Sequence, residues 1–126
     1  MRRSTFAIAG GLAAFLLSGN LIIWILPWSA NPHWLSREMW IAIPFILALA
    51  TLLAAFIAAR LAPRAPYAHG LPFAALPFVR AYDGIVVHNP MWWVGLVATG
   101  GIAAAVAGTY LAWRHRRVSV LRRAHN

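Results

Sequence analysis

Two oppositely charged side chains, Arg80 and Asp83, stand three residues apart in PFVRAYDGIVVHNP, a stretch between two long apolar runs. Residues three apart share one face of a helix, so we expect Arg80 and Asp83 to form an ion pair. An ionisable residue inside a membrane is by default a candidate for binding an anion, a lipid head group or a partner's carboxylate. The alternative, which we favour, is that the pair only ties this stretch to its neighbours.

The side chains that could bind a metal ion are scattered along the chain. His33, His88, Asp83 and Glu38 would fall towards one side of a four-crossing arrangement, and such residues can bind zinc, copper or iron. They lie in separate connecting segments, however, without a closely spaced pair such as HxxxH. No long apolar run carries a histidine between its ends that could bind haem. We therefore expect no metal and no cofactor.

Catalytic groups are equally scarce. The chain has two acidic residues and no cysteine, which excludes thiol nucleophiles, disulfides and thiolate metal sites. No nucleophile–base pair, phosphate-binding loop or pair of carboxylates suited to acid–base catalysis can be assembled. We expect that the protein is not an enzyme.

The elements that carry these residues are apolar. Hydrophobic residues make up 62% of the 126-residue chain and charged residues 10%, whereas globular domains are about half apolar and a quarter charged. The stretches 6–27, 39–59 and 91–113 are uncharged between their ends and long enough to cross a hydrocarbon layer of about 30 Å. These features predict an all-α integral membrane protein with one transmembrane domain, with spans at about 6–27, 39–62 and 91–113 and a basic cytoplasmic tail at 114–126.

Residues 69–88 decide how many times the chain crosses. This segment carries Pro72, Pro77 and Gly84 besides its two charges, and each charge costs about 2.5–3.5 kcal/mol at the centre of a membrane helix. Pairing inside a bundle would lower that cost. We therefore predict a four-span helical bundle of two tandem hairpins, and we keep as an alternative three spans plus a re-entrant or interfacial segment.

The arginines favour four crossings. The net charge is +9, from eleven arginines and two acids. Four crossings place nine arginines on one side and Arg37 alone on the other, with Arg80 in the membrane, whereas three crossings split them almost evenly. Because cytoplasmic loops carry the excess of positive charge, we expect a multi-pass protein of the bacterial inner membrane with both termini cytoplasmic. Arginines that flank apolar spans indicate anionic lipids as partners, so we expect no nucleic acid.

Six tryptophans agree with this threading, because four crossings bring all of them to the outer interface, where aromatic belts form. These interfacial anchors are Trp24, Trp28, Trp34, Trp40, Trp92 and Trp93.

Small residues recur at four-residue spacing within the spans, and such ladders let membrane helices approach closely. The last span carries Gly100, Ala104 and Gly108, and the first carries Gly10, Ala14 and Ser18. They predict helix–helix interfaces, either within the chain or with a partner. An alternative is that alanine-rich spans contain such ladders by composition alone.

These features favour a non-catalytic small membrane protein, an accessory or assembly subunit of a larger membrane complex. Its partners would be the lipid bilayer, other membrane subunits or further copies of itself. The alternatives are a small oligomeric transporter or channel, and a holin-like pore former.

Overall fold

The computed structural model describes the backbone of residues 2–25, 37–86 and 88–124, and the side chains of 3–18, 41–82, 84–86 and 88–119. Over these residues the chain is helical and contains no strand, which confirms the predicted all-α fold. The elements in chain order are α1 (Arg2–Ile25), α2 (Arg37–Leu61), α3 (Pro66–Gly70), the 3₁₀ helix η2 (Leu71–Ala74), α4 (Ala75–Val86) and α5 (Met91–Ala124).

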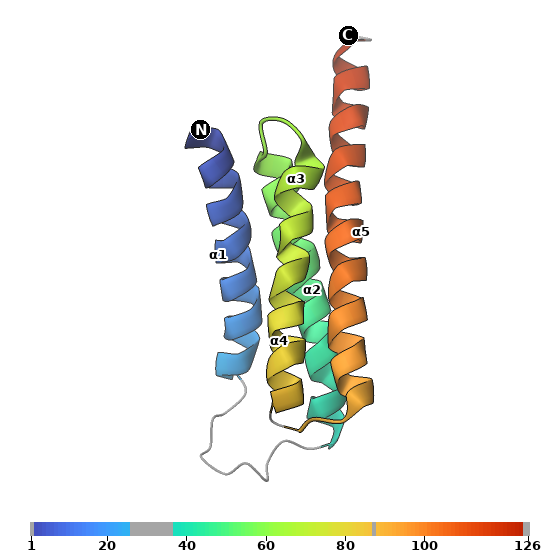
Figure 1. Ribbon diagram of the computed structural model, residues 1–126. Helices are drawn as coiled ribbons and strands as arrows, with labels where there is room; N and C mark the ends of the chain where they lie inside the picture. Colours follow the sequence, from blue (N-terminus) through green and yellow to red (C-terminus); the bar gives the residue numbers. More distant parts are fainter. Residues whose placement is uncertain (1, 26–36, 87, 125–126) are drawn as a thin grey trace.

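Successive helices run in opposite directions (Figure 1). The helix α1 and the segment α3–η2–α4 run one way, whereas α2 and α5 run the other way. The beginning of α1 and the final turns of α5 therefore lie at the same end of the bundle. The central helix is α2, which packs against α1, α5 and the α3–η2–α4 segment.

The α3–η2–α4 segment spans residues 66–86 and covers most of the region whose crossing was in doubt. It begins at Ala65, which adopts the left-handed conformation (φ 48°, ψ 68°) directly before Pro66. Pro72 lies in the first turn of η2, where a missing N–H costs least. Phe73, Pro77, Ala81 and Gly84 are buried on one face. This spacing of four, four and three residues is that of a helix packed along a single side.

A tight turn joins α4 to α5. The N–H of Asn89 donates to the carbonyl of Gly84 (2.8 Å), and the N–H of His88 donates to that of Ile85 (3.1 Å). His88 has φ 59°. These bonds form a Schellman motif, in which the left-handed position is usually glycine. The turn reverses the chain within a few residues, so α4 and α5 become antiparallel neighbours.

The distribution of side-chain size across the bundle is inverted relative to a soluble protein. Of the sixteen buried hydrophobic residues among the described side chains, eleven are alanine. Large apolar side chains instead point outwards: Phe6 is 75% exposed and Phe45 is 63% exposed. Helices that contact each other through small residues, and whose outer surface carries large apolar side chains, are typical of association inside a lipid bilayer.

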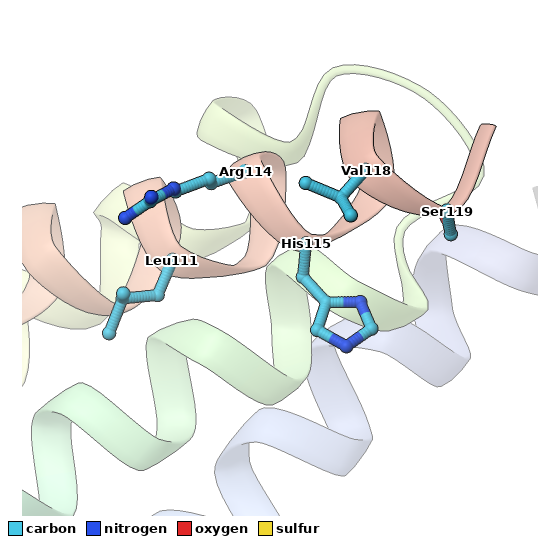
Figure 2. Close-up of a pocket in the computed structure, with 5 residues that line it drawn as sticks. All are labelled: Leu111, Arg114, His115, Val118 and Ser119. Atoms are coloured by element: carbon cyan, nitrogen blue, oxygen red, sulfur yellow. The ribbon is translucent and has the colours of Figure 1, made fainter. Parts of the chain in front are cut away.

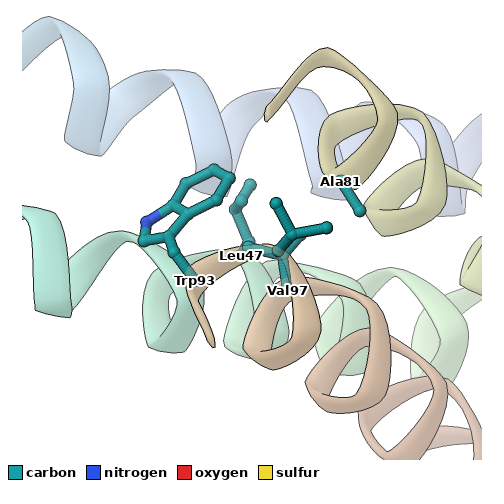
Figure 3. Packing of buried hydrophobic residues seen from close by; sticks show 5 residues of the cluster. Leu47, Ala81, Trp93 and Val97 are labelled. Carbon is teal, nitrogen blue, oxygen red and sulfur yellow. The ribbon is translucent and has the colours of Figure 1, made fainter. Parts of the chain in front are cut away.

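Two clusters of buried residues hold the helices together. One lies where α2, α4 and α5 meet and contains Leu47, Ala81, Trp93, Val94 and Val97 (Figure 3). The other joins α2, η2 and α5 and contains Ala54, Ala55, Ala58, Phe73 and Ala105. Phe15 of α1 packs against both clusters, so the first helix is connected to the same core.

Two helices among the described residues are long and apolar enough to cross a membrane, Ile41–Leu61 and Met91–Ser119. Only 39% of the most apolar window of each is buried in the protein. A core helix of a soluble protein would be mostly covered, because exposed apolar surface is unfavourable in water. The described apolar part of α1, Arg3–Ser18, is shorter.

The basic tail continues α5. The sequence predicts that the last span ends at residue 113 and that the tail begins at 114, and in the structure the helix runs unbroken past Trp113 to Ala124. Figure 1 shows its last turns projecting beyond the ends of α1 and α2. Because no proline or glycine follows Gly108 in α5, nothing in this part of the sequence favours a bend.

Candidate functional site

Most of the positive charge gathers at one end of the bundle, which we call the arginine-rich end. The antiparallel order brings the start of α1, the end of α2, the start of α3 and the later turns of α5 to the same end of the bundle. The arginines with described side chains at this end are Arg3, Arg60, Arg64, Arg114, Arg116 and Arg117.

Arg116 ties α5 to the end of α2. Its Nη2 donates to the carbonyl oxygen of Arg60 (2.6 Å) and also to that of Ala62. The last carbonyls of a helix have no partner within the helix and carry partial negative charge, so a cation stabilises them. Arg116 therefore closes the end of α2 and is held in place by doing so.

Arg60 and His115 are in direct contact across the same junction. Nη1 of Arg60 donates a hydrogen bond to Nδ1 of His115. An arginine is always charged and only donates, so Nδ1 must be the unprotonated nitrogen of the ring. His115 then keeps its proton on Nε2, and that N–H is a further donor at the arginine-rich end.

Another face of α5 carries an aromatic and cationic group. The guanidinium carbon of Arg117 lies 4.2 Å from the centre of the Trp113 ring, a distance at which cations are attracted to aromatic faces. The ring of Tyr110 lies 5.8 Å from that of Trp113. Tyrosine and tryptophan prefer the boundary between hydrocarbon and water, so this pair marks a level on α5 one turn before the arginine-rich end.

A shallow open groove of about 400 Å³ lies along one side of α5. Its lining, shown in Figure 2, consists of Leu111, Arg114, His115, Val118 and Ser119. The spacing of three and four residues places all five on one face of the helix. The groove thus combines an apolar floor from Leu111 and Val118 with the polar groups of the arginine-rich end.

Both acidic residues belong to the opposite end of the bundle. Glu38 lies in the first turn of α2, 22 residues before Arg60, a separation of about 33 Å along the helix axis. Asp83 lies near the end of α4, next to Gly84, which faces Trp93. Trp93 is 22 residues from His115, so Asp83 is similarly remote. Neither acid can neutralise the arginine-rich end.

Arg80 lies on the exposed surface of α4. Gly84 faces Trp93 and Pro77 faces Gly101, so Arg80 is level with about residue 98 of α5. That level is seven residues from Met91, or about 10 Å. The sequence predicts that Arg80 lies in the membrane, and along α5 its level is nearer to Met91 than to the arginine-rich end. The side chain of Asp83 lies outside the described residues, so the predicted ion pair stays a prediction.

The predicted small-residue ladders lie at different depths in the helix interfaces. In α5, Ala104 and Gly108 are buried and Gly100 is half-buried. A Cβ on Gly108 would collide with the carbonyl oxygen of Leu52, whereas one on Gly100 would make an ordinary contact of 3.8 Å with Ala48. Gly108 is therefore the point of closest approach between α2 and α5.

The ladder of α1 is less deeply placed. Gly10, Ala14 and Ser18 are all half-buried, and the hydroxyl of Ser18 donates to the carbonyl of Ala14 within the same helix (2.6 Å). The neighbouring Gly11 is buried instead. A Cβ on Gly11 would lie 2.9 Å from the carbonyl oxygen of Ala54, and one on Gly10 would lie 2.8 Å from Cδ1 of Leu61, so both glycines face α2.

One proline and two glycines of residues 66–86 make close contacts with the neighbouring helices, whereas Pro72 is exposed. Pro77 packs against Gly101, and Gly84 leaves room for the Trp93 ring, since a Cβ there would lie 2.8 Å from its Cζ3 atom. Gly70 lies against Thr109 and the carbonyl of Ala55. Residues that weaken the segment as an isolated helix thus let it approach α2 and α5 closely.

The predicted tryptophan anchors are only partly described. Trp92 is 52% exposed, whereas Trp93 is 6% exposed and belongs to the cluster at the start of α5. Trp92 is thus the tryptophan of this pair that presents its ring to the surroundings. The side chains of Trp24, Trp28, Trp34 and Trp40 lie outside the described residues.

The candidate metal ligands do not form a site in the part of the chain that the structure describes. No three of its histidines, cysteines or acids lie together. His88 terminates α4 through its backbone. His33 and the side chains of Glu38 and Asp83 lie outside the described residues.

The contacts of His115 and Arg116 were not predicted from the sequence. A signal was present, since RHRR directly follows Trp113, and prolines in ARLAPRAP end α2 beside Arg60. Their pairing depends on the antiparallel arrangement of α2 and α5, which residue spacing alone does not define. No protein-family model, curated protein or solved structure matches the chain.

Proposed function

We propose that this chain is an integral membrane protein that crosses the bilayer four times. The observation that carries the proposal is the inverted distribution of side-chain size, with alanine and glycine between the helices and large apolar side chains outside. In water, the exposed Phe6, Phe45, Leu17 and Tyr82 side chains would form apolar surface beyond what soluble monomers expose. In a lipid bilayer, the same apolar surface is solvated by the lipid chains.

The path of residues 66–86 supports a full crossing by the third segment. The α3–η2–α4 segment runs antiparallel to α2 and α5 (Figure 1) and contacts both. A re-entrant segment would return to the end where it started, whereas Pro66 and Val86 lie at opposite ends of this one. Helical backbone satisfies its own hydrogen bonds, as a membrane requires.

The charge distribution supports the orientation. The arginine-rich end carries the first arginines, those after α2 and those of α5, whereas both acids lie at the other end. With the arginine-rich end in the cytoplasm, the chain obeys the positive-inside rule. Both termini are then cytoplasmic, in the inner membrane of a bacterial cell.

Within the membrane we propose a non-catalytic role, as an accessory or assembly subunit of a larger complex. The buried hydroxyls of Thr51 and Thr109 donate to carbonyls of their own helices, Leu47 and Ala105, at 2.7 Å each. In the described interior, the helices therefore pack through alanine, glycine and threonines whose hydroxyls are hydrogen-bonded within their own helix. The surface with which such a small bundle can bind other membrane subunits is its large apolar outer surface.

Purification in a mild detergent tests this role. The full chain with a C-terminal affinity tag is extracted at native expression level, and the co-purifying proteins are quantified by mass spectrometry. We expect one or more other membrane proteins in fixed proportion to the chain. A preparation that contains only homo-oligomers, and that transports a solute when reconstituted into vesicles, would contradict the subunit proposal and favour a transporter or channel.

A further inference from the structure

The arginine-rich end contains a cluster of three residues whose N–H donors suit an anionic ligand. Arg60, His115 and Arg116 come from two helices and are joined by hydrogen bonds: Arg60 to His115 side chain to side chain, and Arg116 to the carbonyl of Arg60. We propose that these three residues, which we call the phosphate site, bind a phosphate group, and that an anionic phospholipid supplies it. This inference rests on the proposed membrane insertion.

The geometry of the cluster suits an anion because its donors are held in place. Arg116 is anchored by two bonds to carbonyls at the end of α2, both from Nη2. A guanidinium has five N–H donors, so Nε and Nη1 of Arg116 still carry theirs. Arg60 likewise uses Nη1 towards His115. With Nε2–H of His115, the phosphate site offers donors from three side chains that are already positioned.

The absence of a nearby acid favours binding of an anion from outside the chain. Arg60 and Arg116 are permanently charged, and they meet at one junction although like charges repel. Both acids of the chain lie about 30 Å away along the helix axes. A phosphate oxygen bridging guanidinium groups forms short, charge-assisted hydrogen bonds, and arginine forks match its geometry.

The position along the bundle favours a lipid over free phosphate. The apolar stretch of α2 ends at Leu61, one residue after Arg60, and Trp113 of α5 lies one turn before Arg116. The phosphate site is therefore at the level of the head groups in the proposed orientation. The groove beside His115 (Figure 2) leads from this level to Leu111, towards the hydrocarbon. It gives the glycerol and acyl part of a lipid an apolar surface.

Lipid titration of the full chain in an uncharged detergent tests the site. Short-chain phosphatidylglycerol, short-chain phosphatidylcholine and inorganic phosphate are added separately, and the rise in unfolding temperature is measured. We expect phosphatidylglycerol alone to stabilise the wild-type chain. Arg60→Gln and His115→Gln should each weaken its apparent affinity about tenfold, the loss typical of one hydrogen bond to a charged group.

The matched control is Arg117→Gln, which removes the same charge from another face of α5, where Arg117 lies over Trp113. This variant should keep most of the wild-type affinity. An equal loss in Arg117→Gln would overturn the site, because it would show that net charge alone attracts the lipid. Full stabilisation by inorganic phosphate would overturn the lipid as the source. Equal stabilisation by phosphatidylcholine, whose phosphate is balanced by its own choline cation, would overturn the requirement for an anionic lipid.

Failure of the underlying membrane proposal would look different. A chain that does not insert would be recovered from cells in the aqueous fraction without detergent. A detergent-dependent chain whose Arg60→Gln and His115→Gln variants bind phosphatidylglycerol like the wild type would refute the phosphate site alone.

Discussion

Gly101 of α5 lies directly against the ring of Pro77 in α4, so close that a Cβ on Gly101 would overlap the Cβ and Cγ atoms of the proline. Proline rings are rigid, and a helix backbone cannot shift locally without cost. The contact fixes the α3–η2–α4 segment to α5 near its middle. It is also the clearest sign that a segment with three prolines is a packed part of the bundle.

Enlarging Gly101 should separate these two helices. We expect Gly101→Val to lower the free energy of unfolding by about 1–3 kcal/mol, as overpacking of a close contact does. The measurement is the unfolding midpoint in a mixed detergent with increasing denaturing detergent. Gly95→Ala is the control, since nothing lies within 4 Å of a Cβ there, and alanine is the better helix former by about 1 kcal/mol. Equal midpoints for the two variants would contradict the packing of α4 on α5.

The ladder of α5 should respond unequally to substitution. Gly108→Ala places a methyl group against the carbonyl oxygen of Leu52, whereas Gly100→Ala makes an ordinary contact with Ala48. We expect Gly108→Ala to destabilise the protein by about 1–3 kcal/mol, and Gly100→Ala to be neutral or slightly stabilising. The same unfolding assay compares them. If Gly100→Ala were the more damaging change, α2 and α5 would not approach each other as described.

Two residues with positive φ should stabilise the protein when replaced by glycine. Ala65 (φ 48°) and His88 (φ 59°) both hold the left-handed conformation, which costs residues with a Cβ roughly 1–2 kcal/mol. We expect Ala65→Gly and His88→Gly each to raise the free energy of unfolding by about 0.5–1 kcal/mol. Ala103→Gly, in the exposed middle of α5, is the control and should destabilise by about 1 kcal/mol. Loss of stability in all three variants would refute these turn conformations.

Arg80 should oppose insertion of its segment. It lies about 10 Å from the level of Met91, where an arginine on a lipid-exposed face carries part of the cost of a central charge. Fused into an insertion reporter, residues 66–86 with Arg80→Leu should insert better by about 1–3 kcal/mol than the natural segment. Arg64 lies before this segment, so the same fusion extended to residue 62 with Arg64→Leu serves as the control and should change little. If Arg80→Leu left the inserted fraction of the segment unchanged, Arg80 would lie outside the hydrocarbon.

Composition and apolar run length predict the helical class and the approximate helix ranges, because both depend on local hydrophobicity. The third segment was harder to predict. Pro72, Pro77 and Gly84 argue against a helix when the segment is considered alone. Pro72 is exposed, whereas the value of Pro77 and Gly84 as contact points depends on Gly101 and Trp93, which lie on another helix. Intrinsic preference was thus outweighed by tertiary packing.

The phosphate site was beyond sequence reasoning for a related reason. Arg60 and His115 are 55 residues apart and meet only because α2 and α5 are antiparallel. The small-residue ladder of α1 shows the limit of spacing arguments as well. Gly10 and Gly11 both face α2, but only Gly11, which the four-residue spacing leaves out, lies against its backbone, at the carbonyl of Ala54.

The most direct test of the account is the side of the membrane on which His88 lies. The natural chain has no cysteine, so single variants Ala65→Cys and His88→Cys can be labelled in intact cells with a membrane-impermeant thiol reagent, and again after permeabilisation. Both positions are exposed at opposite ends of the α3–η2–α4 segment. Four crossings predict that Cys at position 88 reacts in intact cells and that Cys at position 65 reacts only after permeabilisation. Identical behaviour at the two positions would show that this segment does not cross, and would contradict the four-crossing bundle.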